Sequence, residues 1–255
     1  DGTVQGMLKL AGIPFVGSGV LGSSVGMDKD VMKRLFRDSG LPIAKYRVVL
    51  ASEKEKACFG DTAEELGLPF FIKPANMGSS VGVHKVNNPA EFNAAIEDAF
   101  KFDRKVIIEE YIRGREIECA VLGNENPVAS VPGEICTSHD FYSYNAKYTD
   151  EQGAQLNVPA DLPEDIREKI RSFAISSFNS LCCEGLARVD FFLKDDDKVI
   201  VNEVNTIPGF TSISMYPMLF KESGIGCRDL IDRLISLAID RGKKEKQLKF
   251  DKYQV

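Results

Sequence analysis

Two apolar segments near the C-terminal end constrain the fold of this chain most. They cover residues 188–193 and 198–205, and the acidic turn Asp195-Asp196-Asp197 lies between them. Short apolar segments that flank a polar turn are typical of a β-hairpin. We therefore expect a sheet in this region of the chain.

Polar side chains recur at a spacing of two residues in this hairpin. Strand alternation can place Arg188, Asp190, Glu203 and Asn205 on one face. Such a face is often only solvated, but the apolar neighbours favour a covered cleft, where unpaired carboxylates would be costly. Carboxylate and amide oxygens suit Mg²⁺, which keeps positions open for substrate phosphates. We therefore interpret Asp190, Glu203 and Asn205 as candidate metal ligands.

A second candidate site is the glycine-rich segment 73–82, which reads KPANMGSSVG. It lies between two expected strands, so its backbone N–H groups and hydroxyls can approach a phosphate, with Lys73 nearby. It lacks the GxxxxGK[ST] spacing of a Walker loop. A hairpin of this kind is also common as a purely structural turn, and both interpretations stay open at this point.

The segment Gly17 to Gly22 matches the GxGxxG pattern of dinucleotide-binding proteins. That pattern requires a helix that begins inside it and an acidic residue at the end of the next strand. We expect the next helix to begin only at Asp28, and the strand 47–50 ends without a carboxylate. A flexible crossover between two units is the favoured interpretation.

Short strands and amphipathic helices make up the rest of the chain. Ser138 to Gly153 is expected to be a polar loop, long enough to serve as a lid, and the charged tail from Gly242 is expected to be mobile. Helices are expected at residues 5–10, 28–40, 62–66, 88–99, 163–181 and 228–239, and strands at 13–16, 47–50, 70–73, 83–86, 106–109, 116–122 and 127–131.

Composition excludes several classes of protein. With 44% hydrophobic residues the chain can bury a core, and a net charge of -6 without a basic tract argues against nucleic acid or an anionic membrane as a partner. No apolar segment approaches the roughly 20 residues of a membrane span. Six cysteines without a CxxC pair suggest buried thiols in a reducing cytosol.

Several motifs together resemble the D-alanine:D-alanine ligases of the ATP-grasp superfamily. These motifs occur in order over nearly the whole chain. They are KP and GSSVG at 73–82, EE and GRE at 109–116, AKY at 146–148, ARVD at 187–190 and NEVNTIPGFTS at 202–212.

The resemblance implies an α+β fold in which two subdomains enclose ATP. The smaller would cover residues 18–113 and the larger residues 114–255, while residues 1–17 would end an N-terminal domain that is otherwise missing. That domain would supply further substrate contacts and, in a possible homodimer, subunit contacts. D-alanine would be the substrate, with ATP and two Mg²⁺ ions, or Mn²⁺ in their place, as cofactors.

The resemblance also implies a role for each candidate residue. Asp190, Glu203 and Asn205 would hold the metal ions. The ATP contacts would come from Lys29, Lys73, Lys147, Glu109 and Glu116. The remaining residues would act on the substrates: Arg188 and Gly209 on the tetrahedral intermediate, Ser79 and Tyr148 on the attacking amine, and Ser214 on the second carboxylate.

Two other functions stay open beside ligation of D-alanine. The chain could belong to another ATP-grasp carboxylate–amine ligase, although such a protein would lack the Ala146-Lys147-Tyr148 segment and the Thr211-Ser212 segment after the metal strand. It could also be a nucleotide-binding fragment without turnover. The resemblance further implies that D-lactate and D-serine are poor acceptors, since Tyr148 and Ser214-Met215 match the D-alanine type.

Overall fold

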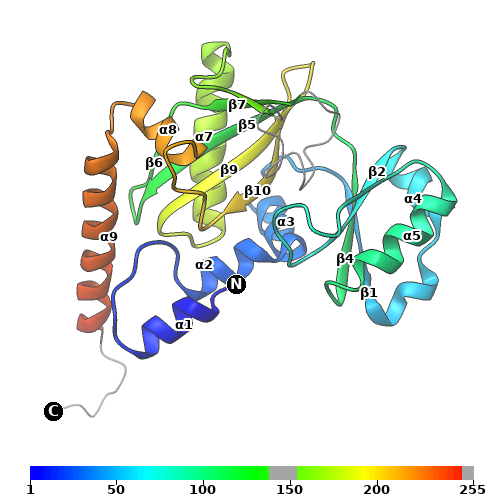
Figure 1. Ribbon diagram of the computed structural model, residues 1–255, viewed down its shortest axis with the longest axis horizontal. Helices are drawn as coiled ribbons and strands as arrows, with labels where there is room; N and C mark the ends of the chain where they lie inside the picture. Colours follow the sequence, from blue (N-terminus) through cyan, green and yellow to red (C-terminus); the bar gives the residue numbers. More distant parts are fainter. Residues whose placement is uncertain (138–153, 249–255) are drawn as a thin grey trace.

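The computed structural model describes residues 1–137 and 154–248. These residues form two antiparallel sheets, each covered by helices (Figure 1). Within these ranges, no helix is both long and apolar enough to cross a membrane. The predicted lid 138–153 lies outside the described residues.

The smaller sheet has four strands in the order β1-β4-β2-β3. Helices α4 and α5 cover it, and its core includes Phe70, Ile72, Phe92 and Ile96. The elements are β1 (Tyr46–Leu50), the 3₁₀ helix η1 (Ala51–Lys56), α4 (Phe59–Leu66), β2 (Phe70–Pro74), β3 (His84–Val86), α5 (Pro89–Ala99) and β4 (Lys105–Glu110).

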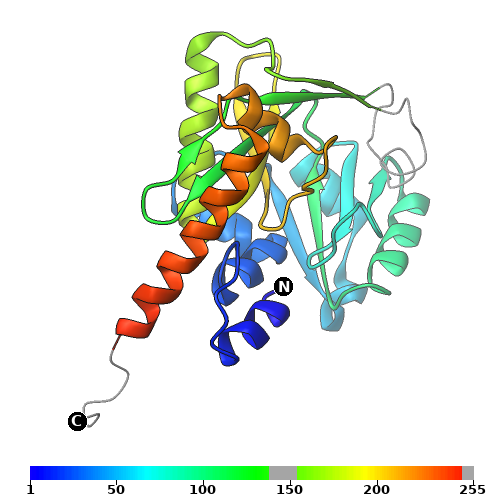
Figure 2. The same cartoon turned by 60° about the vertical axis from the view of Figure 1, so that its left-hand side comes forward.

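The larger sheet has six strands, in the order β10-β9-β5-β7-β8 with β6 paired to β5. Helix α7 covers one face, and α8 and α9 lie over the other (Figure 2). The elements are β5 (Arg115–Gly123), β6 (Val128–Ala129), β7 (Gly133–Thr137), β8 (Ala154–Asn157), α7 (Glu164–Ser180), β9 (Gly185–Leu193), β10 (Val199–Asn205), α8 (Met215–Glu222) and α9 (Cys227–Gln247).

Strand β5 shows how alternation divides the larger sheet. Ile117, Cys119 and Val121 point into the core beneath α7, whereas Ala120 and Leu122 point into the core beneath α8 and α9. On this face of β5, α8 and α9 cover the end of the strand that holds Ala120 and Leu122. The other end of that face carries the polar side chains of the candidate site.

Helix α3 (Lys29–Asp38) connects the two units. Met32 and Phe36 are buried in the core of the larger sheet, and Val201 N donates to the Pro42 carbonyl just after the helix. At the start of the helix, Lys29 N donates to the carbonyl of Ala75 in the smaller unit. The division into subdomains at residue 114 stays a prediction.

Most of the expected elements are present, and the C-terminal hairpin is confirmed as β9 and β10. Asp28 caps α3 as expected, because its carboxylate accepts from Asp30 N and Val31 N. Strands β7 and β8 and helix α8 were not predicted. They fall in segments where turn residues and short apolar stretches give no clear period.

The strand expected at residues 13–16 is wrong, and so is the flexible crossover after it. Residues 13–16 form no strand, because Arg241 of α9 binds the carbonyls of Phe15 and Gly17, at 2.8 and 2.6 Å. The chain then forms helix α2 (Val20–Met27), after the N-terminal helix α1 (Thr3–Leu10). Without a preceding strand, the GxGxxG match lacks its dinucleotide-binding context.

The expected start of a mobile tail at Gly242 is also wrong, since α9 continues to Gln247, while residues 249–255 lie outside the described residues. Pro14 lies against Gly242, where a Cβ would stand 3.0 Å from its Cγ, and Lys244 pairs with Glu125 at 2.6 Å. These contacts stabilise a helical turn that the charged sequence alone does not favour.

The cysteines differ from the prediction of buried thiols. All six are free, but only Cys119 and Cys183 are buried, and Cys136 is half-buried. Cys58, Cys182 and Cys227 are exposed. Composition cannot separate these cases, because a cysteine side chain is small enough for either environment.

Candidate functional site

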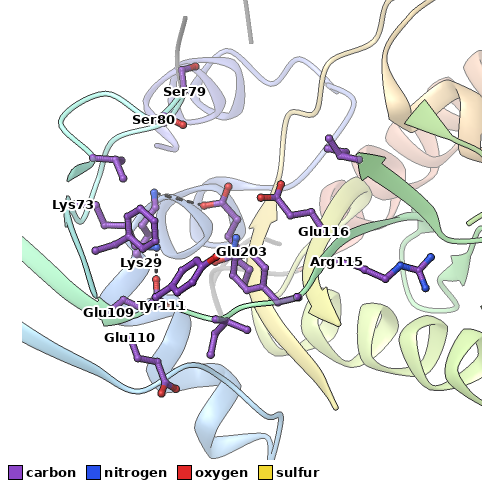
Figure 3. A pocket seen from close by; sticks show the side chains of 18 of the residues that line it. Lys29, Lys73, Ser79, Ser80, Glu109, Glu110, Tyr111, Arg115, Glu116 and Glu203 are labelled. Atoms are coloured by element: carbon purple, nitrogen blue, oxygen red, sulfur yellow. Dashed lines mark ion pairs between the residues drawn. The ribbon is translucent and has the colours of Figure 1, made fainter. Parts of the chain in front are cut away.

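A pocket of about 430 Å³ lies between the two sheets. In Figure 3, Glu203 and Glu116 of the larger unit point toward the side on which Lys29 lies, whereas Arg115 points away. The lining from the smaller unit includes Lys29, Phe71, Lys73, Met77, Gly78, Ser79, Ser80, Val83, Glu109, Glu110 and Tyr111, and that from the larger unit includes Arg115, Glu116, Glu134, Ile135, Cys136, Phe192, Asn202 and Glu203.

Two lysines meet one buried glutamate on the wall of the smaller sheet. Glu109 of β4 pairs through one oxygen with Lys33 of α3 and through the other with Lys73 of β2. Burial alone would raise the pKa of Glu109, but the two ammonium groups outweigh it and lower the pKa to about 2. The carboxylate is therefore ionised at neutral pH and orients both lysines.

Lys29 reaches across the pocket toward the larger sheet. Its Nζ donates to the Met77 carbonyl at 2.6 Å and lies 3.7 Å from Glu203 Oε2, an ion pair drawn in Figure 3. Burial lowers the pKa of Lys29, and the charge of Glu203 opposes that shift. The pair joins the two walls of the pocket.

The glycine-rich loop lines the rim of the same pocket. Ser79 and Ser80 have φ values of 53° and 59°, which place them in the left-handed region. Gly82 has a φ of 68°, and a Cβ there would stand 2.8 Å from the ring of Phe102, so only glycine fits. Asn76 donates to Asp103 from both its backbone and its side chain, which anchors the start of the loop.

The larger sheet places a cluster of alternating charge beside the pocket. Arg188 binds Asp190 through two hydrogen bonds of 2.7 and 2.8 Å, and its Nε lies 3.1 Å from Glu118 Oε2. Asn205 Nδ2 donates to Asp190 at 2.9 Å. Burial alone would lower the pKa of Arg188, but Asp190 and Glu118 raise it above its usual value.

A β-bulge brings Glu203 onto this face. Val201 pairs with Phe191, but Glu203 rather than Asn202 pairs with Asp190, so β10 holds one extra residue. Val201 and Val204 both stay in the core beneath α7. Without the bulge, Glu203 would point into that core, because a shift of one residue exchanges the two faces.

The predicted metal ligands therefore lie together as two carboxylates and one amide. Glu203 and Asp190 are cross-strand partners, and Asn205 contacts Asp190. Among the described residues, no group of three His, Cys, Asp or Glu side chains has the arrangement of a metal site. The oxygen donors still match the preference of Mg²⁺, which binds through one or two carboxylates.

The remaining predicted residues divide into three groups. Lys29, Lys73, Ser79, Glu109 and Glu116 line the pocket, as does the candidate metal ligand Glu203. Gly209 and Ser214 lie together just before α8 but not in the lining, and Ser214 Oγ accepts from Thr211 N at 3.0 Å. Lys147 and Tyr148 lie outside the described residues.

Two buried charged residues of this region, Lys33 and Glu118, were not predicted from the sequence. The spacing of each one from a predicted site residue could have indicated its position. Lys33 follows Lys29 by four residues on one helix, and Glu118 follows Glu116 by two on one strand. Neither lies in a motif that carried the resemblance.

Comparison with known proteins identifies many relatives. A family model described as "D-ala D-ala ligase C-terminus" matches residues 35–236. The chain is 59% identical over 249 residues to a D-alanine–D-alanine ligase of Oceanobacillus iheyensis, and 53% identical to D-alanine–D-alanine ligase A of Salmonella typhimurium. Each match covers 98% of this chain and 68% of the relative.

Solved structures agree with these matches. The D-alanine–D-alanine ligase from Coxiella burnetii superposes with a TM-score of 0.87 at 39% identity, over 97% of this chain and 66% of that one. The VanG D-Ala:D-Ser ligase from Enterococcus faecalis gives a TM-score of 0.86 at 39% identity, over 93% and 69%. The chain thus spans about two thirds of the length of these proteins.

Proposed function

The chain belongs to the D-alanine–D-alanine ligase family and has its ATP-grasp fold, and from this premise we propose that it joins two D-alanines in an ATP-dependent reaction. The observation that carries the proposal is the charge across the pocket. Lys29 and Lys73 lie on one wall and Glu203 on the other. A triphosphate needs the cations, and the Mg²⁺ that accompanies it needs the carboxylates.

The adenosine part would bind beside the aromatic side chains of the pocket. Phe71 and Tyr111 line it with ring centroids 5.9 Å apart, and Phe192 lines it from the larger sheet. Glu116 is a lining carboxylate that can accept from ribose hydroxyls. The carboxylate of Glu109 is engaged by two lysines, so we assign it to the phosphate end through Lys73 rather than to adenine.

Asp190, Glu203 and Asn205 would hold Mg²⁺ or Mn²⁺, since their oxygens suit a hard cation and two of them are opposed across the strands. When bound, the metal neutralises charge on the phosphates. The protein supplies the lysines that orient the phosphates and the half-buried setting of Asp190 and Glu203.

The chemistry follows from the groups that the two walls bring together. The carboxylate of the first D-alanine attacks the γ-phosphorus of ATP, which releases ADP and forms an acyl phosphate. The amine of the second D-alanine then attacks the acyl carbon, phosphate leaves and the amine proton is lost. Arg188 and backbone N–H groups near Gly209 would stabilise the negative oxygen formed in this second step.

Three further residues would act on the substrates. Ser79 lines the pocket on the loop and would orient the attacking amine together with Tyr148. Ser214 would bind the carboxylate of the second D-alanine. Lys147 would contact the γ-phosphate, in line with the family resemblance. The dipeptide would serve peptidoglycan synthesis in the cytosol, and a homodimer is the assembly we propose.

Two alternatives to ligation of two D-alanines are each favoured by one observation. Because the chain spans about two thirds of its relatives, it can be a nucleotide-binding part that does not turn over alone. Because one structural neighbour is named a D-Ala:D-Ser ligase, D-serine is the first alternative acceptor to test.

The proposal and both alternatives can be tested together. Calorimetry measures MgATP binding, and mass analysis then identifies the products formed from D-alanine, D-serine and D-lactate in competition. MgATP binding with D-alanyl-D-alanine as main product supports the proposal. Binding without any dipeptide supports the nucleotide-binding part, and D-alanyl-D-serine as main product identifies the other acceptor. Absence of MgATP binding contradicts the proposal.

A further inference from the structure

Lys33 is a buried lysine to which the proposed reaction assigns no task. Its side chain is 1% exposed, and it pairs with Glu109, whose other oxygen holds Lys73. We propose that Lys33 is a positioning residue that acts through Glu109 to hold Lys73 against the phosphates of the nucleotide. This inference rests on the proposed ATP site.

The position of Lys33 follows from the packing of α3. Met32 and Phe36 of this helix are at most 1% exposed in the core of the larger sheet, so the helix is firmly seated there. Lys33 points instead to β4 of the smaller sheet, where it meets Glu109. The residue thus connects the seated helix to the wall that carries Lys73.

Lys33, Glu109 and Lys73 differ in how deeply their side chains are buried, and this difference indicates which of them can contact a ligand. Lys33 cannot reach the pocket, which it does not line, whereas the side chain of Lys73 is 13% exposed and lines it. Glu109 lies between them with 5% of its side chain exposed. Lys33 therefore affects a ligand only through Glu109 and Lys73.

Charge balance gives Lys33 a second effect on the same ligand. A single lysine on Glu109 would form a neutral pair, and the carboxylate would offset the attraction of Lys73 for an anion. With two lysines on one carboxylate, the group keeps one net positive charge toward the pocket. Without Lys33, Lys73 would be the only cation paired with this buried carboxylate.

The test compares ATP with adenosine, which lacks the phosphates. For Lys33→Met we expect MgATP affinity to fall at least tenfold by calorimetry, while adenosine affinity, measured by ligand-observed NMR, stays within twofold. A merely structural role would weaken both ligands alike. Lys33→Arg should restore most of the MgATP affinity, because it keeps the charge and the donors.

Arg37→Met is the matched control, since it removes an exposed cation from the next turn of the same helix. It should leave both affinities unchanged. Wild-type protein that fails to bind MgATP would contradict the proposed function itself, whereas wild-type binding with an unaffected Lys33→Met variant would overturn only this inference.

The double variant Lys33→Met/Glu109→Gln, compared with Glu109→Gln alone, covers the case in which Lys33→Met does not fold. Replacing both members of the pair by neutral residues avoids an unpaired buried charge. If Lys33 acts through Glu109, the double variant should bind MgATP no more weakly than Glu109→Gln alone. A double variant that binds MgATP clearly more weakly than Glu109→Gln alone would overturn the inference.

Discussion

The two walls of the pocket differ in the sign of their charge and in its depth. On the smaller sheet two lysines surround one glutamate, and the inner members are almost fully buried, with 1% and 5% of the Lys33 and Glu109 side chains exposed. On the larger sheet carboxylates outnumber the arginine. There Asp190 and Glu203 keep 15% and 31% of their side chains exposed.

This difference separates two tasks. The positive wall is satisfied by its own ion pairs and offers a preformed surface to an anion, which lowers the reorganisation that binding requires. In the negative wall Glu118 is buried, but Asp190 and Glu203 lie closer to solvent, and their oxygens suit a hydrated divalent cation. We therefore expect changes in the positive wall to alter ATP affinity, and changes in the negative wall to alter turnover and its dependence on Mg²⁺.

Glu203→Gln should have the largest effect, because it removes a metal-ligand charge from the negative wall. Loss of about 3 kcal/mol of transition-state stabilisation would lower turnover on the order of 100-fold. Steady-state kinetics at several Mg²⁺ concentrations measure it. Asp196→Asn, in the exposed turn of the same hairpin, is the control and should have no effect.

Full activity of Glu203→Gln at low Mg²⁺ would contradict the metal assignment. Reduced helix content in the variant would instead show a folding defect, which circular dichroism detects.

Lys73→Met tests the positive wall directly. Loss of one charge-assisted contact of about 1.5–3 kcal/mol predicts MgATP affinity roughly 10- to 100-fold lower. Calorimetry measures this affinity. Lys101→Met removes an exposed lysine of the same unit and should leave it unchanged. If Lys73→Met lowered turnover at saturating ATP but not affinity, the two walls would not divide their tasks as described.

Glu118→Gln tests whether the negative wall also positions its arginine. Glu118 is buried beside Arg188, so its loss leaves the guanidinium with one charged partner fewer. We expect turnover to fall about tenfold, which is typical of residues that orient a functional group, with MgATP affinity unchanged. Kinetics and calorimetry on the same preparation separate the two, and a change confined to affinity would contradict the comparison.

Much of this arrangement could be predicted from sequence, and the limits have physical causes. Alternation predicted that Arg188, Asp190, Glu203 and Asn205 share a face, and the structure confirms it. Alternation could not predict the bulge at Asn202 that turns Glu203 to this face, since a bulge leaves no local pattern.

Buried ion pairs were the second feature that could not be predicted from the sequence. Lys33 reads as a solvated lysine on α3, because its partner Glu109 lies 76 residues further along the chain. Helix α2 was missed for a related reason. Its Gly22 lies against the backbone of Cys182, where a Cβ would stand 2.7 Å from the carbonyl oxygen, so this helical glycine is favoured by a distant contact.

Asp28→Asn should have the smallest effect and tests whether depth matters, because its ion pair lies outside the pocket and is more exposed than that of Lys33 and Glu109. Asp28 pairs with Lys105 at 2.7 Å, but 19% and 18% of the two side chains are exposed. Asparagine caps a helix nearly as well as aspartate, so only the charge is lost, at a cost of about 1 kcal/mol or less. Urea unfolding at neutral pH measures this loss, and Asp28→Ala, which also removes the cap, should lose about 1 kcal/mol more.

The pH dependence identifies the charge as the cause. Burial raises the pKa of Asp28, but Lys105 and the N–H of Val31 lower it overall, below its usual 3.8. A lowered carboxyl pKa stabilises the folded state above the unfolded value, and this contribution disappears as the pH falls through the folded pKa. The difference in unfolding free energy between wild type and Asp28→Asn should therefore be constant above pH 5 and shrink below about pH 4. A difference that persisted unchanged at pH 2 would mean that packing, and not the ion pair, makes Asp28 stabilising.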